Sequence, residues 1–233
     1  MRKLAATALL GLSLLGAPVV AEVITDDAKE FLKPNTLAAQ GCMKLGDCTD
    51  GIEPINDFVQ LLDHYGIFWK GALAREILEL SYIIEELNDV GVQMYLSDSF
   101  YFPKTVRGIY YTDDNHLFMN EFHGRNFKVF LEVLRHEAWH AAQDCMAGTI
   151  DNSLIAIILD PAEIPDQVKM LTEIRYKFYA PKAIPWEQEA IFAGGTPDMT
   201  LDALKACSVG QMWRVYTPTP KTEEWLKKEG FMK

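Results

Sequence analysis

The stretch that decides the fold is Arg135-His136-Glu137-Ala138-Trp139-His140-Ala141, which carries the pattern H-E-x-x-H. Two histidines four residues apart lie one turn above the other on the same face of an α-helix, so both imidazoles can bind one zinc ion. The glutamate beside the first histidine is placed to accept a proton from a zinc-activated water. The stretch therefore predicts a helix with a zinc site, with His136 and His140 as ligands and Glu137 as general base.

The helix that carries this motif is expected to begin at about Asn126, which can cap it, and to stop at Gly148. Apolar residues recur along one face at helical spacing: Phe127, Phe130, Leu131, Leu134, Ala138, Ala141 and Cys145. The two histidines fall at the edge of this face, beside Val129 and Val133. They are therefore expected to line the floor of a cleft, and Trp139 to lie in the cleft wall or the core.

A catalytic zinc ion takes three protein ligands and keeps one position for water, so a third ligand is expected downstream. The metzincin pattern is excluded because Gln143 and Met146 stand where it requires glycine and histidine. The run Gly148-Thr149-Ile150-Asp151 resembles the start of the deuterolysin-type motif, in which aspartate is the ligand. That motif continues with Tyr-Gly, where this chain has Leu154-Ile155. Asp151 is one alternative for the third ligand.

A second motif follows the first at Trp186-Glu187-Gln188-Glu189-Ala190, which gives the order H-E-x-x-H and then E-x-E-A. This order resembles the minimal gluzincins, a set of small bacterial metallopeptidases of the zincin superfamily. The resemblance covers about residues 108 to 195, mainly through these two short motifs. It implies an α+β, zincin-like fold that is mostly helical. A small antiparallel sheet would pack on the histidine helix, with its edge strand over the cleft.

The same resemblance implies that a glutamate of this second motif is the third ligand. In the common gluzincin pattern the ligand stands three residues before the alanine, which is Glu187 here. Many relatives have an aspartate directly after that alanine, whereas this chain has Ile191, so Glu189 remains the alternative. The two glutamates project about 200° apart on a helix, so only one of them can face the metal.

The activity implied by the resemblance is zinc-dependent hydrolysis of peptide bonds. Glu137 would take the proton from the zinc-activated water and give it to the leaving amine. The strand near residues 116–122 is expected to bind the substrate backbone as an added strand. His123, Tyr176 and Tyr179 are candidate donors to the oxyanion, and Gln143 could support His140 from behind. The alternative is an exported binding or interaction protein without turnover, in which zinc only stabilises the fold.

Residues 1–21 differ from the rest of the chain and are expected to be a signal peptide. Arg2 and Lys3 precede an apolar run that ends at Ala17, and small residues precede Glu22. We therefore expect residues 22–233 to form one soluble domain, periplasmic or extracellular, with no membrane segment. Loss of Arg2 and Lys3 leaves 20 basic and 33 acidic residues, so the formal charge of −11 becomes −13. This charge argues against nucleic acid and anionic lipid as partners. A peptide or protein substrate is expected.

Four cysteines in an exported chain predict two disulfides. Four cysteines allow three connectivities, of which Cys42 with Cys48 and Cys145 with Cys207 is the most economical. The second bridge would tie the end of the histidine helix to a C-terminal helix. Residues 22–54 have no sustained periodicity and are expected to be irregular, held by the first bridge.

The other expected elements follow from periodicity. Helices are expected at 55–65, 71–88, 165–179, 186–195 and 200–207. Strands are expected at 92–96, 108–111 and 116–122, of which the last two form a hairpin. Residues 154–159 fit a strand or a helix. The helix at 165–179 is expected to bury Val168, Leu171, Ile174 and Phe178, and Glu76, Glu79, Glu85 and Glu86 to form a solvated face.

Overall fold

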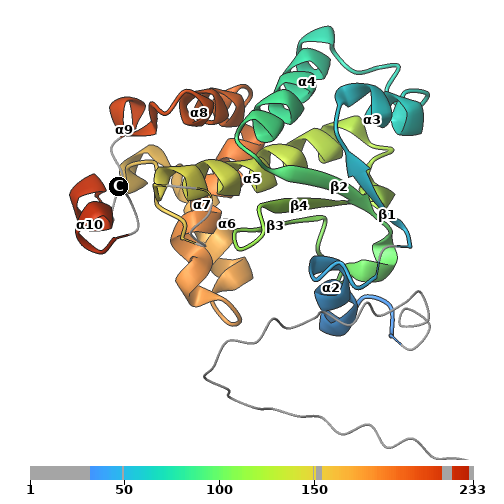
Figure 1. Cartoon of the computed structure of the whole chain (residues 1–233), viewed down its shortest axis with the longest axis horizontal. Coiled ribbons are helices and arrows are strands. Elements are labelled where there is room, and N and C mark those ends of the chain that lie inside the picture. The colour runs from blue at the N-terminus through green and yellow to red at the C-terminus, as the bar shows by residue number, and fades with distance from the viewer. Residues whose placement is uncertain (1–31, 49, 149, 151–153, 217–221, 231–233) are drawn as a thin grey trace, which may run out of the picture.

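A four-stranded sheet and the long helix α5 (Phe127–Met146) form the centre of the structure (Figure 1). The computed structural model describes residues 32–48, 50–148, 150, 154–216 and 222–230. The predicted signal peptide, residues 1–21, lies outside these ranges. The strands are β1 (Ile52–Ile55), β2 (Gln93–Ser97), β3 (Gly108–Tyr111) and β4 (His116–Asn120). The other helices are α2 (Leu37–Lys44), α3 (Phe58–Tyr65), α4 (Ala74–Asp89), α6 (Asp166–Tyr176), α7 (Ile184–Gly195), α8 (Met199–Ser208), α9 (Met212–Val215) and α10 (Glu223–Lys228).

The sheet is mixed, with the strand order β1-β2-β4-β3. β3 and β4 form the predicted antiparallel hairpin, in which Ile109 pairs with Phe118. β2 and β4 are parallel, with Gln93 opposite His116, so the expectation of an antiparallel sheet is wrong at this pair. After β2 the chain crosses to β3 on the far side of the position of β4, and the hairpin then brings it back so that β4 lies between β2 and β3. β4 is therefore an inner strand, and β3 is the sheet edge nearer to α5.

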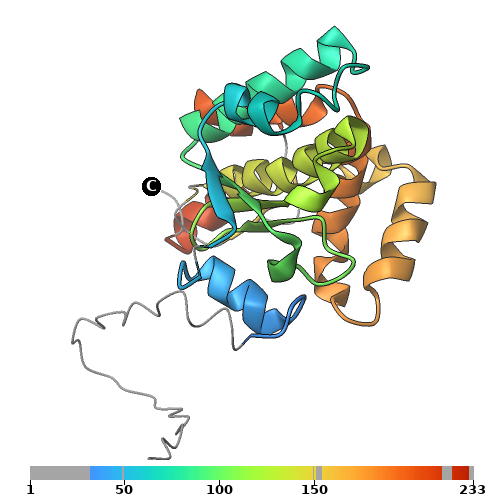
Figure 2. The same ribbon diagram turned by 90° about the vertical axis from the view of Figure 1, so that its right-hand side faces the viewer.

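Each face of the sheet packs against a different layer of helices (Figures 1 and 2). Met94, Leu96, Leu117 and Met119 point to one face and join the core with α4 and α5. The alternate residues point to the other face, where Phe118 packs with Ala39 and Met43 of α2. This alternation follows from the two-residue period of a strand. The segment before residue 55, which was predicted to be irregular, therefore contains helix α2, which covers one face of the sheet, and strand β1, which forms one of its edges.

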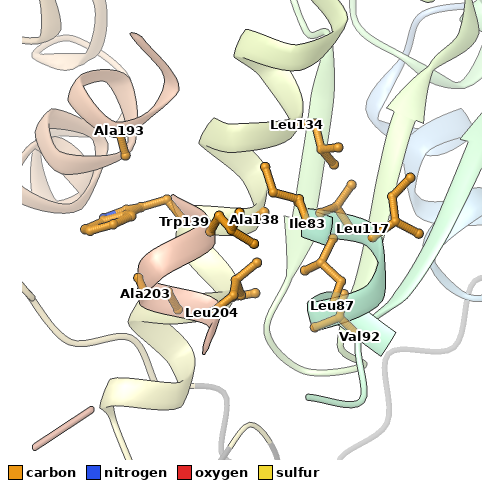
Figure 3. Close-up of a cluster of buried hydrophobic side chains, with 14 of the residues drawn as sticks. Ile83, Leu87, Val92, Leu117, Leu134, Ala138, Trp139, Ala193, Ala203 and Leu204 are labelled. Carbon is orange, nitrogen blue, oxygen red and sulfur yellow. The ribbon is translucent and has the colours of Figure 1, made fainter. Parts of the chain in front are cut away.

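The main core joins α4, α5, α7 and α8, as Figure 3 shows for Leu87, Leu134, Trp139, Ala193 and Leu204. Trp139 is fully buried, so it belongs to the core. α5 begins at the predicted cap, because the Asn126 side chain accepts a hydrogen bond from the backbone N–H of Val129. None of the helices in the described ranges has the length and apolar composition needed to cross a bilayer.

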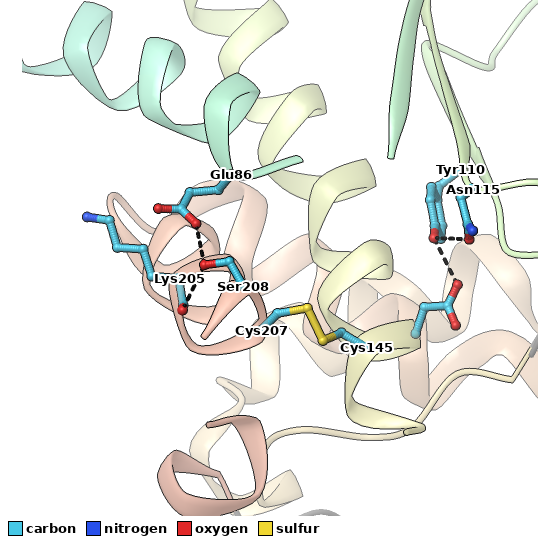
Figure 4. The surroundings of a disulfide bond; sticks show 8 residues. Glu86, Tyr110, Asn115, Cys145, Lys205, Cys207 and Ser208 are labelled. Carbon is cyan, nitrogen blue, oxygen red and sulfur yellow. Dashed lines mark hydrogen bonds between the residues drawn. A yellow bond between two sulfur atoms is a disulfide. The ribbon is translucent and has the colours of Figure 1, made fainter. Parts of the chain in front are cut away.

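The cysteines pair as predicted, Cys42 with Cys48 and Cys145 with Cys207. The second bridge joins the end of α5 to α8 (Figure 4). Two disulfides are typical of proteins that fold in an oxidising environment, which agrees with export.

Three further expectations from the sequence are wrong. Glu79 is buried rather than solvated, because it forms a two-pronged ion pair with Arg135 and accepts a hydrogen bond from the backbone N–H of Asp198. Residues 154–159 form neither a strand nor a helix. Leu171 and Ile174 on α6, and Phe178 in the turn after it, are exposed, and the helix contacts α7 through its opposite side.

Candidate metal centre

The two motif histidines lie together on α5 and are mostly buried. Their ring centroids are 5.0 Å apart, and the side chains of His136 and His140 are 18% and 13% exposed. His136, Glu137 and His140 each offer a ligand atom, and these atoms all lie within 4.8 Å of one another. These three residues therefore form a group that could hold a metal ion.

A carboxylate from α7 reaches both imidazoles. Glu187 Oε2 lies 3.4 Å from Nε2 of His136, and Glu187 Oε1 lies 3.7 Å from Nε2 of His140. The Glu187 side chain is 16% exposed, so all three groups meet in a largely buried place. Of the two glutamates that the sequence left as alternatives, Glu187 is the one that the fold brings to the histidines. Asp151 lies outside the described residues.

Small residues on α7 allow this helix to approach α5 closely. Glu187, Ala190 and Gly194 recur at helical spacing on one side of α7, and Ala190 and Ala193 are fully buried. A Cβ atom added at Gly194 would lie 2.9 Å from the backbone oxygen of Glu132 and 3.4 Å from Cβ of His136. The lack of a side chain at Gly194 therefore determines how near Glu187 can come to the histidines.

The donor set fits a divalent transition metal. Glu187 Oε2 is buried without a hydrogen-bond partner, and such an unsatisfied carboxylate oxygen is costly unless a cation neutralises it. Burial by itself would raise the pKa of Glu187, but its contacts with His136 and His140 outweigh burial and lower this pKa to about 2. The group is therefore an ionised carboxylate beside two imidazole nitrogens, which is a donor set that zinc accepts.

The pKa values of the two histidines are shifted in opposite directions. Burial by itself would lower the pKa of His136, but the contact with Glu187 and the charge of Glu137 outweigh burial and raise it. The pKa of His140 is lowered, chiefly by burial. At neutral pH, His140 therefore presents an uncharged ring, the form that binds a metal.

Glu189 makes a different set of contacts and is linked to His140 through the side chain of Gln143. The carboxylate is fully buried and accepts hydrogen bonds from Trp139 Nε1 at 3.2 Å and Gln143 Nε2 at 2.7 Å. The backbone N–H groups of Ile158 and Leu159 also donate to it. Gln143 Oε1 lies 2.8 Å from Nδ1 of His140. This bond fixes the proton of His140 on Nδ1 and leaves Nε2, which faces Glu187, free to bind a metal.

Glu137 lies beneath the edge strand β3. Its side chain is buried, and burial together with the charge of Glu187 raises the pKa of Glu137 to about 7. The backbone N–H of Tyr110 donates to its carboxylate. A Cβ atom at Gly108 would lie 2.7 Å from Cγ of Glu137 and 2.9 Å from Cγ1 of Val133. Gly108 thus lets the edge strand pass directly over the glutamate.

One of the three candidate oxyanion donors contacts the site. Tyr176, on α6, lies against Glu187, and burial followed by the charge of Glu187 raises the pKa of its hydroxyl. Tyr179 lies beside it, with the ring centroids 5.3 Å apart. His123 lies in the short turn Glu121–His123 that follows β4, where its ring packs on Phe122.

Sequence reasoning missed Gly108, Tyr110 and the buried ion pair of Arg135 with Glu79. Glycine in a strand is a signal for close approach of another group, and it could have identified Gly108. An acid on a helix gives no such signal, because an exposed glutamate and a buried one look alike until the partner is known.

Comparisons with known proteins do not add to these observations. No protein-family model, no curated protein and no solved structure matches the chain. The described residues establish an α+β fold in which His136, Glu137 and His140 form a group able to hold a metal ion, with Glu187 in contact with both histidines.

Proposed function

We propose that this protein is a zinc-dependent peptidase with a zincin-like site. One observation carries the proposal: the Glu187 carboxylate lies 3.4 Å and 3.7 Å from Nε2 of His136 and His140, from a separate helix. Two histidines one turn apart with a glutamate from a second helix form the ligand set of gluzincin peptidases, which the sequence motifs resemble. His136, His140 and Glu187 would hold the metal.

Zinc, when bound, would supply Lewis-acid chemistry, polarising a peptide carbonyl and lowering the pKa of a water molecule. Glu137 follows His136 directly and is not needed as a ligand when Glu187 takes that role. Its carboxylate is therefore available to take a proton from the attacking water and to deliver it to the leaving amine. Gln143 and Glu189 hold the ring of His140 in place throughout.

The substrate backbone would bind along β3. This strand is an edge of the sheet, whereas β4 is paired on both sides, so the expectation that residues 116–122 bind substrate is wrong. An edge strand presents unpaired backbone groups to which an extended peptide can add as a further strand. β3 passes over Glu137 at Gly108, so a peptide along this edge would run beside the proposed general base.

A binding protein with a structural zinc ion is the alternative. Structural zinc sites are generally closed by four protein ligands, whereas catalytic sites have three and leave one position open. Within the described residues, His136, His140 and Glu187 are the three side chains that would serve as ligands besides Glu137, and this number favours the catalytic reading.

The test is zinc content together with peptide hydrolysis. We expect the purified protein to bind one zinc ion and to cleave a mixed library of fluorogenic peptides. Glu187→Ala should lose the zinc, Glu137→Gln should keep the zinc and lose turnover, and Glu173→Ala, at an exposed glutamate of α6, should change neither. Full zinc content in Glu187→Ala would refute the ligand assignment. Full turnover in Glu137→Gln would refute the role of Glu137.

A further inference from the structure

Helix α6 presents a row of apolar side chains to solvent. Met170, Ile174 and Phe178 are spaced four residues apart, with Leu171 beside them, and they are 55%, 64%, 86% and 51% exposed, respectively. Phe178 lies in the turn directly after α6, in which the backbone N–H of Ala180 bonds to the oxygen of Tyr176. We call these four residues the α6 stripe. Figure 2 shows α6, in light orange, on the outer side of α7.

The α6 stripe is not needed to hold α6 on the protein. The opposite side of the helix already packs against α7, where Thr172 is buried and Tyr176 contacts Glu187. An amphipathic helix normally turns its apolar row inward, and contiguous exposed apolar patches on monomers are rare and often functional. The row on α6 therefore indicates a surface that another molecule covers.

The charges beside the α6 stripe identify the occupant. Acidic residues, Glu163 and Asp166, stand at the N-terminal end, and basic residues, Lys177 and Lys182, stand at the C-terminal end. Asp166 and Lys177 are eleven residues apart, which is three helical turns, so they lie on the same flank of the stripe. A second α6 running antiparallel, with Lys177 opposite Asp166, would place the two-fold axis between Leu171 and Thr172 and Met170 of each copy beside Ile174 of the other.

We propose that the α6 stripe is a self-association surface, on which α6 of a second copy of this chain packs antiparallel about a two-fold axis. Both patches are then the same, as a two-fold contact requires, and each copy supplies an acid and a base to the other. The pair of Asp166 with Lys169, at 3.5 Å, does not compete strongly, because the Asp166 side chain is fully exposed.

An anionic lipid surface fits these residues less well. A helix that docks on such a surface carries lysine and arginine around its apolar face, whereas acids accompany this row at Glu163, Asp166 and Glu173. The stripe faces away from Tyr176, so the second copy leaves the Glu187 side of α6 uncovered.

Sedimentation velocity over a series of concentrations tests this proposal, with the metal present and absent. The parent protein should dimerise as its concentration rises, and Met170→Asp and Ile174→Asp should each abolish dimerisation. Ile67→Asp is the matched control, because Ile67 is 69% exposed outside α6, and it should dimerise like the parent. Circular dichroism of each variant checks that the fold is intact.

Charge reversal makes the test specific for an antiparallel copy. Asp166→Lys and Lys177→Glu should each weaken the dimer about tenfold, because both copies then place like charges together. The double variant should restore the parent Kd. A parent that stays monomeric, or a double variant no better than the single ones, would overturn the proposal. Stripe-dependent binding of a monomeric parent to phosphatidylglycerol vesicles would overturn it in favour of lipid.

Discussion

The carboxylate of Glu189 accepts a 2.7 Å hydrogen bond from the amide nitrogen of Gln143, whose oxygen lies 2.8 Å from Nδ1 of His140. The two residues thus connect the buried interior of the protein to a candidate metal ligand. Replacing the carboxylate by an amide should weaken this connection. In Glu189→Gln, the new amide nitrogen would face donors such as the backbone N–H groups of Ile158 and Leu159.

We expect Glu189→Gln to weaken zinc binding by about 10- to 100-fold without emptying the site at saturating zinc. The measurement is the zinc Kd by competition with a chromophoric chelator. Glu173→Gln is the control, and its affinity should match the parent. An unchanged affinity in Glu189→Gln would show that Gln143 holds His140 without help from the carboxylate.

The edge strand supplies a second prediction. Gly108→Ala would place a Cβ atom 2.7 Å from Cγ of Glu137, so the glutamate or the strand must move. Because a displaced catalytic group costs much of its rate, kcat of peptide hydrolysis should fall on the order of 100-fold, with the zinc content unchanged. At Gly41 an added Cβ would meet nothing within 4 Å, so Gly41→Ala should retain activity.

The affinity for zinc should depend on pH through His136. The pKa of His136 in the metal-free protein is raised. Protons therefore compete with the metal for this ring already at pH values above the ordinary histidine pKa, and more strongly as the pH falls. Binding should therefore strengthen as the pH rises from about 5 to about 8, because a ring that loses its proton gains a free nitrogen. Calorimetric titrations across this range would measure it, and a pH-independent Kd would contradict it.

The buried ion pair should contribute to stability. Glu79→Gln leaves the guanidinium of Arg135 buried without its charge partner, and breaking such a pair typically costs 3–5 kcal/mol, so we expect a loss of about 3 kcal/mol. Urea unfolding would measure it. Glu85→Gln, at an exposed position of the same helix, should change the free energy of unfolding by less than about 0.5 kcal/mol. Equal effects at both positions would mean that the pair contributes little.

The disulfides should differ in their contribution. The bridge of Cys145 with Cys207 closes a separation of 62 residues, and that of Cys42 with Cys48 closes 6. In the chain-entropy model, replacing the first pair by serine should cost about 4 kcal/mol, and the second pair about 2 kcal/mol. Urea unfolding of the two double variants measures both, and the reverse order would contradict this model.

The sequence predicted the elements whose signals are local. The motif helix, its cap at Asn126 and the hairpin of the strands near 108–111 and 116–122 depend on residues close in sequence, and all three are observed. The place of β4 inside the sheet depends on the parallel pairing with β2, which joins residues far apart in the chain. Strand order of this kind leaves no trace in the periodicity of either strand.

α6 shows the same limit for side chains. Its periodicity correctly indicates a helix with one apolar row, but the row of Ile174 and Phe178 faces solvent. Periodicity shows that two faces of a helix differ in polarity, but it does not show which face packs against the rest of the protein. For the candidate site, His136, Glu137 and His140 follow from one motif. The resemblance of the second motif implied Glu187 but left Glu189 as the alternative, because which of the two reaches the histidines depends on Gly194 and the packing of two helices.

Glu187 and Glu189 leave α7 in opposite directions, one toward the imidazoles of His136 and His140 and the other toward Gln143 and the backbone at residues 158–159. A tilt of α7 that withdraws one carboxylate therefore dislodges the other as well. The position of Glu187 beside the histidines and the orientation of the His140 ring are therefore coupled, because both depend on the same turn of α7. The candidate centre should consequently form or come apart in one step, with little population of states in which only one of the two glutamates is in place.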